Sequence, residues 1–101
     1  MARQAEEIIS AQASFFMKQL QELDAVDTIC AYRERVERFR DMELTKALAS
    51  LQAGKSAEEV LPELANLLTN KIMHEPTTQL RQAAFDGDMD VLVAARRLFD
   101  L

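Results

Sequence analysis

Residues 68–77 of the chain read Leu68-Thr69-Asn70-Lys71-Ile72-Met73-His74-Glu75-Pro76-Thr77. Leu68 and Ile72 are four residues apart and predict the apolar face of a helix. Because a residue that precedes proline disfavours helical backbone angles, Glu75 and Pro76 are predicted to end or kink that helix. The polar side chains here form a predicted polar helix-end cluster, which comprises Thr69, Asn70, His74 and Thr77. This stretch therefore predicts two helices that are joined at Pro76.

His74, the single histidine of the chain, is predicted to serve the helix end rather than to catalyse a reaction. A partial positive charge near a helix C-terminus complements the helix dipole, and the imidazole can also bond a carbonyl that Pro76 leaves free. Thr69 and Asn70 lie among apolar residues, where an unbonded polar group costs free energy. We expect these two side chains to fix the docking angle of the next helix or to pair across a two-fold interface.

The rest of the chain has the composition of an all-α protein. Gly and Pro number two each, hydrophobic residues make up 49%, and no stretch alternates as a strand does. We predict a helical bundle with two long helices followed by about three shorter ones, in a single domain of residues 1–101. The predicted helices cover residues 2–23, 28–52, about 61–75, 77–86 and 88–99.

Local signals set the predicted helix boundaries. Asp27 is a plausible N-cap for the second helix, and Gly54 is a natural stop for it. Ser56 and Glu59 match a capping box. Pro62 conflicts with a helix that starts at this box, because proline inside a helix removes a backbone hydrogen bond. We therefore expect the third helix to start at about residue 61, after a short turn. The remaining predicted boundaries are a stop at Gly87 and a cap at Asp88.

The two long helices predict an apolar flank that the chain cannot cover by itself. Each would span roughly 33–37 Å at 1.5 Å per residue, and a compact globule of 101 residues is only roughly 33 Å across. The three shorter helices cannot cover both flanks of both long ones, so we expect the uncovered flank, which includes Ile8 and Phe15, to pack against another chain or domain. The candidates for core or dimer interface, which the pattern does not separate, are Ile8, Phe15, Phe16, Val36, Phe39, Leu68 and Ile72.

Charge and composition count against several classes of partner. The net charge is −5 and the pI is about 4.8, whereas DNA binding needs clustered lysine and arginine. No apolar run reaches the roughly 18 residues that cross a bilayer, and the N-terminus lacks an apolar signal core. We therefore predict no DNA partner, no membrane partner and a cytoplasmic location.

The sequence predicts no catalytic residue, no cofactor site and no metal site. It contains no glycine-rich phosphate loop and no Ser-His-Asp set. Cys30 is the single cysteine, which fits a reducing compartment, and it lacks a neighbouring histidine that would activate its thiol. With Cys30 and His74 far apart in the sequence, no metal-ligand spacing arises. From its residues alone, the chain is not an enzyme.

A run of mixed charge occupies residues 33–43 and ends at Glu43. Arg33 with Glu37, and Glu34 with Arg38, are pairs at i,i+4 spacing that stabilise a helix by a few tenths of a kcal/mol each. We predict that this run is a solvated face. Contact between its arginines and nucleic-acid phosphate is the alternative, although the interleaved acids weaken it.

Residues 68–77 closely resemble a segment in the C-terminal domain of glutamyl-tRNA reductases, in which LTNK, two apolar residues, H, any residue and PT follow one another. The resemblance covers nearly the whole chain and keeps the same order. Residues 2–23 are similar to the end of the family's long spinal helix, and residues 28–101 to its remaining helices. Pro62 departs from the family's third helix. The further matching segments are residues 5–9 with Phe16, 33–51, 80–84, 86–88 and 94–99.

The resemblance implies a homodimerisation domain that carries none of the enzyme's catalytic machinery. The whole enzymes use a catalytic cysteine and NADPH to convert glutamyl-tRNA to glutamate 1-semialdehyde, a precursor of tetrapyrroles such as porphyrins. Cys30 matches neither the surroundings of that cysteine nor the nucleotide-binding motif. The resemblance thus implies a V-shaped homodimer that is joined through this domain. Two alternatives remain: a surface at residues 33–40 that contacts tRNA, and a surface that docks a regulator or the next enzyme of the pathway.

Overall fold

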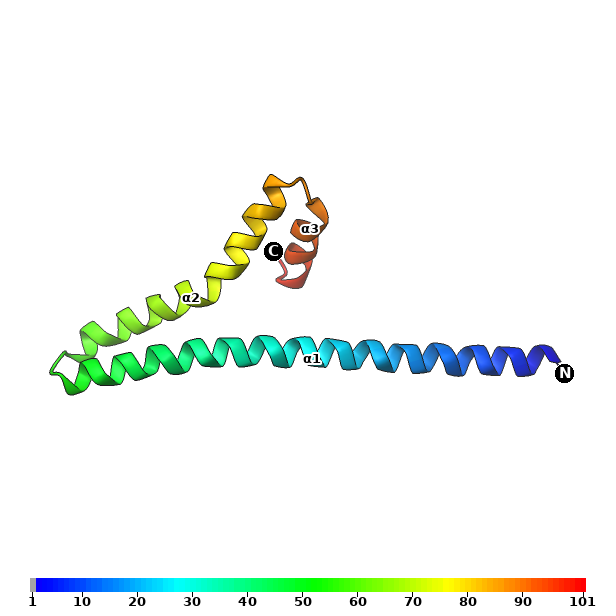
Figure 1. Cartoon of the computed structure of the whole chain (residues 1–101), viewed down its shortest axis with the longest axis horizontal. Coiled ribbons are helices and arrows are strands. Elements are labelled where there is room, and N and C mark those ends of the chain that lie inside the picture. Colours follow the sequence, from blue (N-terminus) through cyan, green and yellow to red (C-terminus); the bar gives the residue numbers. More distant parts are fainter. Residues whose placement is uncertain (1) are drawn as a thin grey trace. The chain divides into compact units, whose positions relative to one another are not determined.

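The computed structural model describes residues 2–101, and side-chain burial from Arg3 onward. These residues form three α-helices and no strand, namely α1 (Ala2–Gln52), α2 (Ala57–Phe85) and α3 (Met89–Leu98) (Figure 1). The predicted all-α class is confirmed. The predicted number of helices is wrong, because the expected breaks at Asp27 and Pro76 both lie inside continuous helices.

α1 continues through residues 24–27, so the predicted N-cap at Asp27 is wrong. No glycine or proline lies here, and aspartate in a helix interior costs less than about 0.7 kcal/mol relative to alanine. Extending an existing helix adds a hydrogen bond per residue, whereas starting a new one is unfavourable. The Oγ1 of Thr28 donates to the carbonyl of Asp24 at 3.0 Å, as hydroxyls inside helices often do.

α2 contains both prolines of the chain, Pro62 and Pro76. The expected start near residue 61 is wrong, since α2 begins at Ala57, directly after its cap Ser56. The expected separate helix after Pro76 is also wrong. A kink was the other expectation, and α2 does bend, about midway along its length (Figure 1). Proline lacks the N–H that would bond the carbonyl four residues earlier, and its ring crowds that carbonyl.

The boundaries that rest on glycine and serine chemistry are confirmed. Gly54 has φ 101° after the end of α1, and Gly87 has φ 75° after the end of α2, values that glycine adopts without a Cβ clash. The Oγ of Ser56 accepts a hydrogen bond from the amide of Glu59 at 3.3 Å. Asp88 occupies the expected place before α3, but its side chain caps no amide.

The chain divides into two compact units, Met1–Glu37 and Arg38–Leu101. The first unit holds the N-terminal part of α1, and each of its described side chains up to Arg35 is exposed. The second unit holds the rest of α1 together with α2 and α3, and α3 packs against α2. Among the described residues, the buried apolar side chains all lie in this second unit, and they are Ala47, Val60 and Ala83.

Candidate functional site

The first unit exposes several large apolar side chains. Ile8 is 59% exposed, Phe15 63% and Phe16 59%. The same part of α1 also exposes Ile9 and Leu20. Helical residues at spacings of three and four share a face, so Ile9, Phe16 and Leu20 form one apolar stripe. Three of the residues that were predicted for the core or interface, Ile8, Phe15 and Phe16, are thus exposed in the first unit.

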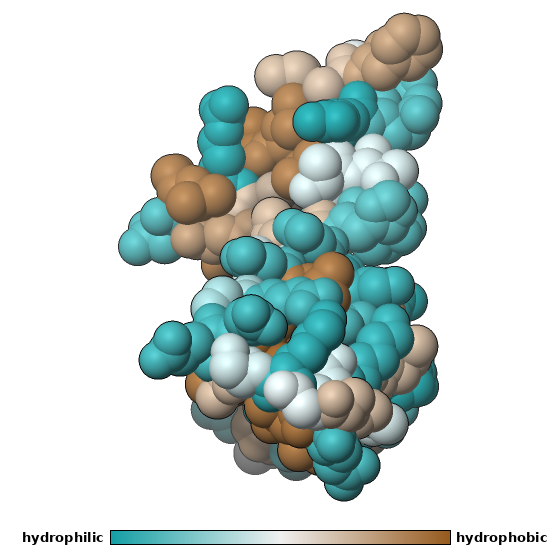
Figure 2. All heavy atoms as spheres, turned by 90° about the vertical axis from the view of Figure 1, so that its left-hand side faces the viewer, coloured by the Kyte–Doolittle hydropathy of each residue, from teal (hydrophilic) through white to brown (hydrophobic). Residues whose placement is uncertain are grey.

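A second exposed apolar face belongs to the second unit. Leu44, Leu48 and Leu51 follow one another at spacings of four and three along the last turns of α1, and each is exposed. Leu61 on α2 is exposed as well. In the view towards the α1–α2 turn, apolar groups reach the surface between hydrophilic ones (Figure 2). These leucines were absent from the predicted interface residues, although their spacing is the signal that identifies them.

The polar cluster of residues 69–77 does not sit at a helix end, because α2 continues to Phe85. The predicted role of His74 as a helix-end cap is therefore wrong. The Oγ1 of Thr69 donates to the carbonyl of Ala65 at 2.9 Å, within its own helix. Thr77 is half-buried, whereas Asn70 and His74 are exposed. The cluster is thus a polar surface in the middle of α2.

Part of this cluster lies beside a residue of α1. A cavity of about 430 Å³ is lined by Phe39 and Leu67 together with Asn70, Lys71, His74 and Glu75. Phe39 is half-buried. The structure therefore brings Phe39, Asn70 and His74 together around one cavity, which has both apolar and polar lining residues. Three further predicted residues, which are half-buried but do not line this cavity, are Val36, Leu68 and Ile72.

Glu43 of α1 is buried between α1 and α2, and only 2% of its surface is exposed. Its Oε1 lies 3.3 Å from the Nζ of Lys46, and its Oε2 is buried without a hydrogen-bond partner in the described structure. The prediction that residues 33–43 are a solvated face is therefore wrong at Glu43. A signal was present in the sequence, because Phe39, Glu43 and Ala47 are spaced by four and belong to one helix face.

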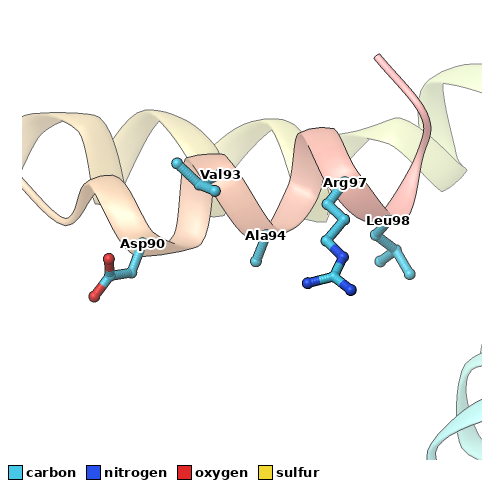
Figure 3. Close-up of a pocket in the computed structure, with 5 residues that line it drawn as sticks. All are labelled: Asp90, Val93, Ala94, Arg97 and Leu98. Atoms are coloured by element: carbon cyan, nitrogen blue, oxygen red, sulfur yellow. The ribbon is translucent and has the colours of Figure 1, made fainter.

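The outer surface of α3 offers no comparable site. A hollow there is lined by Asp90, Val93, Ala94, Arg97 and Leu98. Asp90, Ala94 and Arg97 extend from the same side of this one helix (Figure 3). Two opposite charges with an alanine between them do not converge on a point where a reacting atom would sit.

Titratable and nucleophilic side chains in the described residues do not gather into a reaction centre. No group of three or more His, Cys, Asp and Glu side chains in residues 2–101 is placed to hold a metal ion. Cys30 is exposed on α1. None of the three described helices combines the length and the hydropathy that a membrane span needs. What the described surface offers is apolar faces and a cavity with both apolar and polar lining residues, which are features of a binding surface.

Comparison with known proteins agrees with this surface. The family described as "Glutamyl-tRNAGlu reductase, dimerisation domain" matches residues 4–101. Glutamyl-tRNA reductase of Coxiella burnetii (strain Dugway 5J108-111) is 50% identical over 100 residues, which is 99% of this chain and 24% of that protein. The glutamyl-tRNA reductase of Pseudomonas fluorescens (strain SBW25) is also 50% identical, over 99% of this chain and 23% of its own length.

The chain therefore spans about a quarter of the length of the curated relatives that it matches. No solved structure matched it. The resemblance that residues 68–77 carry is confirmed by a match that covers nearly every residue of the chain. The chain belongs to the family of glutamyl-tRNA reductase dimerisation domains.

Proposed function

We propose that this chain joins two copies of a glutamyl-tRNA reductase into a homodimer and carries out no chemistry itself. The observation that supports this function best is the exposure of apolar side chains at helical spacing on α1. They are Ile8, Ile9, Phe15, Phe16 and Leu20 in the first unit, and Leu44, Leu48 and Leu51 in the second. A second copy is the occupant that the family description names.

The free energies of side-chain burial and of association show how much of this surface a dimer must bury. Fully burying a leucine or phenylalanine is worth about 1.5–3 kcal/mol, so burying the exposed half is worth about 1 kcal/mol. Ten such side chains, five from each copy, would supply about 10 kcal/mol. Association itself costs roughly 4–15 kcal/mol. A single small patch is therefore insufficient, and we expect the interface to take up most of the exposed apolar surface of α1.

The whole protein is proposed to be the enzyme that its relatives are named for. It would reduce glutamyl-tRNA to glutamate 1-semialdehyde with NADPH, in the biosynthesis of tetrapyrroles, and would act in the cytoplasm. The catalytic cysteine and the nucleotide-binding site would then lie in the part of the protein that this chain does not cover. Joining two such enzymes is the contribution of the present domain.

A concentration series of thermal melts tests the proposed dimer. If the folded state is a dimer and the unfolded state is not, mass action raises the melting temperature with protein concentration. We expect the melting temperature, measured by circular dichroism, to rise steadily as the chain concentration increases from micromolar to millimolar. A midpoint that is independent of concentration would contradict the proposed function.

Contact with tRNA is a second candidate function, favoured by exposed arginines on α1. Arg33, Arg35 and Arg38 are exposed, while the Nε of Arg40 lies 3.0 Å from the Oδ1 of Asp41. Phosphate contacts make binding weaken steeply with salt. A gel shift with tRNA at low and moderate salt tests this function, and binding should fall when these arginines are replaced by glutamate.

Docking of a regulator or of the next enzyme of the pathway is a further candidate, and the cavity beside Phe39 and His74 is the described surface that suits it. Pull-down with the purified domain, followed by sizing of the complex, separates a heterologous partner from a second copy. A partner that binds equally well to the Phe39→Ala variant would not use this cavity.

A further inference from the structure

The buried carboxylate of Glu43 is incompletely satisfied by its own chain. Glu43 is 2% exposed, and Lys46 reaches only its Oε1, at 3.3 Å. Its Oε2 is buried without a hydrogen-bond partner in the described structure. Lys46 itself remains 62% exposed, so it does not close the site. Buried polar atoms in folded proteins are nearly always paired, and an unpaired buried carboxylate oxygen is strongly unfavourable.

The space beside Glu43 has the charge of a cation site. Glu43 lines a cavity of about 210 Å³ between α1 and α2. The residues that line this cavity include two that are acidic, Glu43 and Glu63, and one that is basic, Lys46. The hydroxyl of Ser50 is a further acceptor, and the rest of the lining is Ala47, Val60, Leu64 and Leu67. A guanidinium suits such a place, since it is less strongly hydrated than an ammonium and donates in a planar fork.

A second copy of this chain carries such guanidinium groups on its surface. This cavity and the larger one beside Phe39 share one lining residue, Leu67, and Glu43 is adjacent in sequence to the exposed Leu44. The chain carries exposed arginines at Arg33, Arg35 and Arg38. In a two-fold dimer each contact occurs twice. The same arginine, contributed once by each copy, would therefore satisfy both copies of Glu43.

We propose that in the dimer an arginine from residues 33–38 of one copy binds the Oε2 of Glu43 in the other copy, and thereby sets the register of the interface. This inference rests on the proposed homodimer. An apolar stripe along a long helix allows several offsets between two copies. A buried charge that is satisfied at one offset alone selects that offset, as single buried polar residues do in coiled coils.

The test compares Glu43→Gln and Glu43→Leu with the unchanged chain, by sedimentation equilibrium and by thermal melting at high dilution. Glu22→Gln, at an exposed position of the same helix, is the matched control. We expect the dimer dissociation constant to rise by about tenfold or more for both Glu43 variants and to stay unchanged for the control. The melting temperature of the dilute monomer should stay the same or rise, because the buried charge has been removed.

Charge exchange identifies the partner arginine. Glu43→Arg should abolish the dimer, and combining it with one of Arg33→Glu, Arg35→Glu or Arg38→Glu should restore it, whereas the other two combinations should not. A wild-type dimer whose dissociation constant is unchanged in Glu43→Gln would overturn the inference, as would a dilute monomer that this variant destabilises. Both results would mean that Glu43 is satisfied within one copy. A wild-type chain that stays monomeric would instead overturn the proposed homodimer, whatever the variants do.

Discussion

Val60 and Glu43 show at the residue scale how small the self-contained core of this chain is. Val60 is 2% exposed, and the other buried apolar side chains of the described residues are alanines. A core of one valine and two alanines cannot outweigh much chain entropy. The fold of the second unit therefore depends strongly on Val60, and on whatever covers its exposed leucines.

Val60→Ala should destabilise the domain by about 2 kcal/mol, because it removes two buried methyl groups and leaves a small cavity. Urea unfolding at a fixed protein concentration measures the change. Val93→Ala is the control, since Val93 is 60% exposed, and it should change the free energy of unfolding by less than about 0.5 kcal/mol. Equal effects at the two positions would show that Val60 is not a core residue.

The burial of Glu43 is marked in the sequence only by its helical spacing with Phe39 and Ala47, and the exposure of His74 is not marked at all. A glutamate inside a charge run has the local signature of a solvated side chain. Its burial follows from the packing of α2 on α1, which is a tertiary effect. The same is true of His74, whose position in the middle of α2 depends on the helix continuing past Pro76.

At the scale of the element, helix boundaries were predicted correctly where the local sequence signal was strong, and wrongly where it was weak. Gly54, Ser56 and Gly87 were predictable, because positive φ and side-chain capping are local chemistry. The interruptions at Asp27 and Pro76 were wrongly predicted. Two aspartates cost too little to break a helix, and packing of α3 against α2 supports the helix beyond its proline.

Pro62→Ala should stabilise the domain by about 1–3 kcal/mol, since Pro62 is exposed inside α2 and removes a backbone bond there. The melting temperature at fixed concentration reports the change. If the variant were less stable, the proline ring would be making contacts that outweigh the lost hydrogen bond.

Gly54→Ala should have the opposite sign. An alanine at φ 101° is strained although nothing crowds its Cβ, and the expected loss of stability is about 1–2 kcal/mol. Chemical unfolding of this variant beside Ala53→Gly, a neighbouring change in the same turn that introduces no positive-φ strain, separates strain from turn flexibility. An unchanged midpoint for Gly54→Ala would mean that the turn adopts another conformation.

At the scale of the whole molecule, the length of α1 favours the proposed partnership with a second copy. A helix of 51 residues is about 76 Å long, more than twice the diameter of roughly 33 Å that a compact chain of this size would have. The two helices that were predicted for residues 2–23 and 28–52 are one continuous helix, which exceeds that diameter further than either predicted helix would. Which apolar residues form the interface could not be read from the sequence, because periodicity identifies a face but not the surface that covers it.

Phe16→Asp tests whether the apolar stripe of the first unit belongs to the interface. Phe16 is 59% exposed in one copy, so its replacement should leave the dilute monomer folded. It should weaken the dimer by about tenfold or more, because a charge would be buried against apolar surface. Glu6→Asp at an exposed acidic position of α1 is the control. A variant with unchanged size and melting temperature would remove Phe16 from the interface.

The mass of the unchanged chain in solution decides whether two copies associate. Multi-angle light scattering across a concentration series gives this mass without assumptions about shape. We expect a mass of about 23 kDa, twice the 11.4 kDa of one copy, and dissociation of the dimer on dilution. A mass that stays at 11.4 kDa up to a roughly millimolar chain concentration would contradict the dimer. At that concentration even an association free energy of about −4 kcal/mol would leave half of the sites occupied.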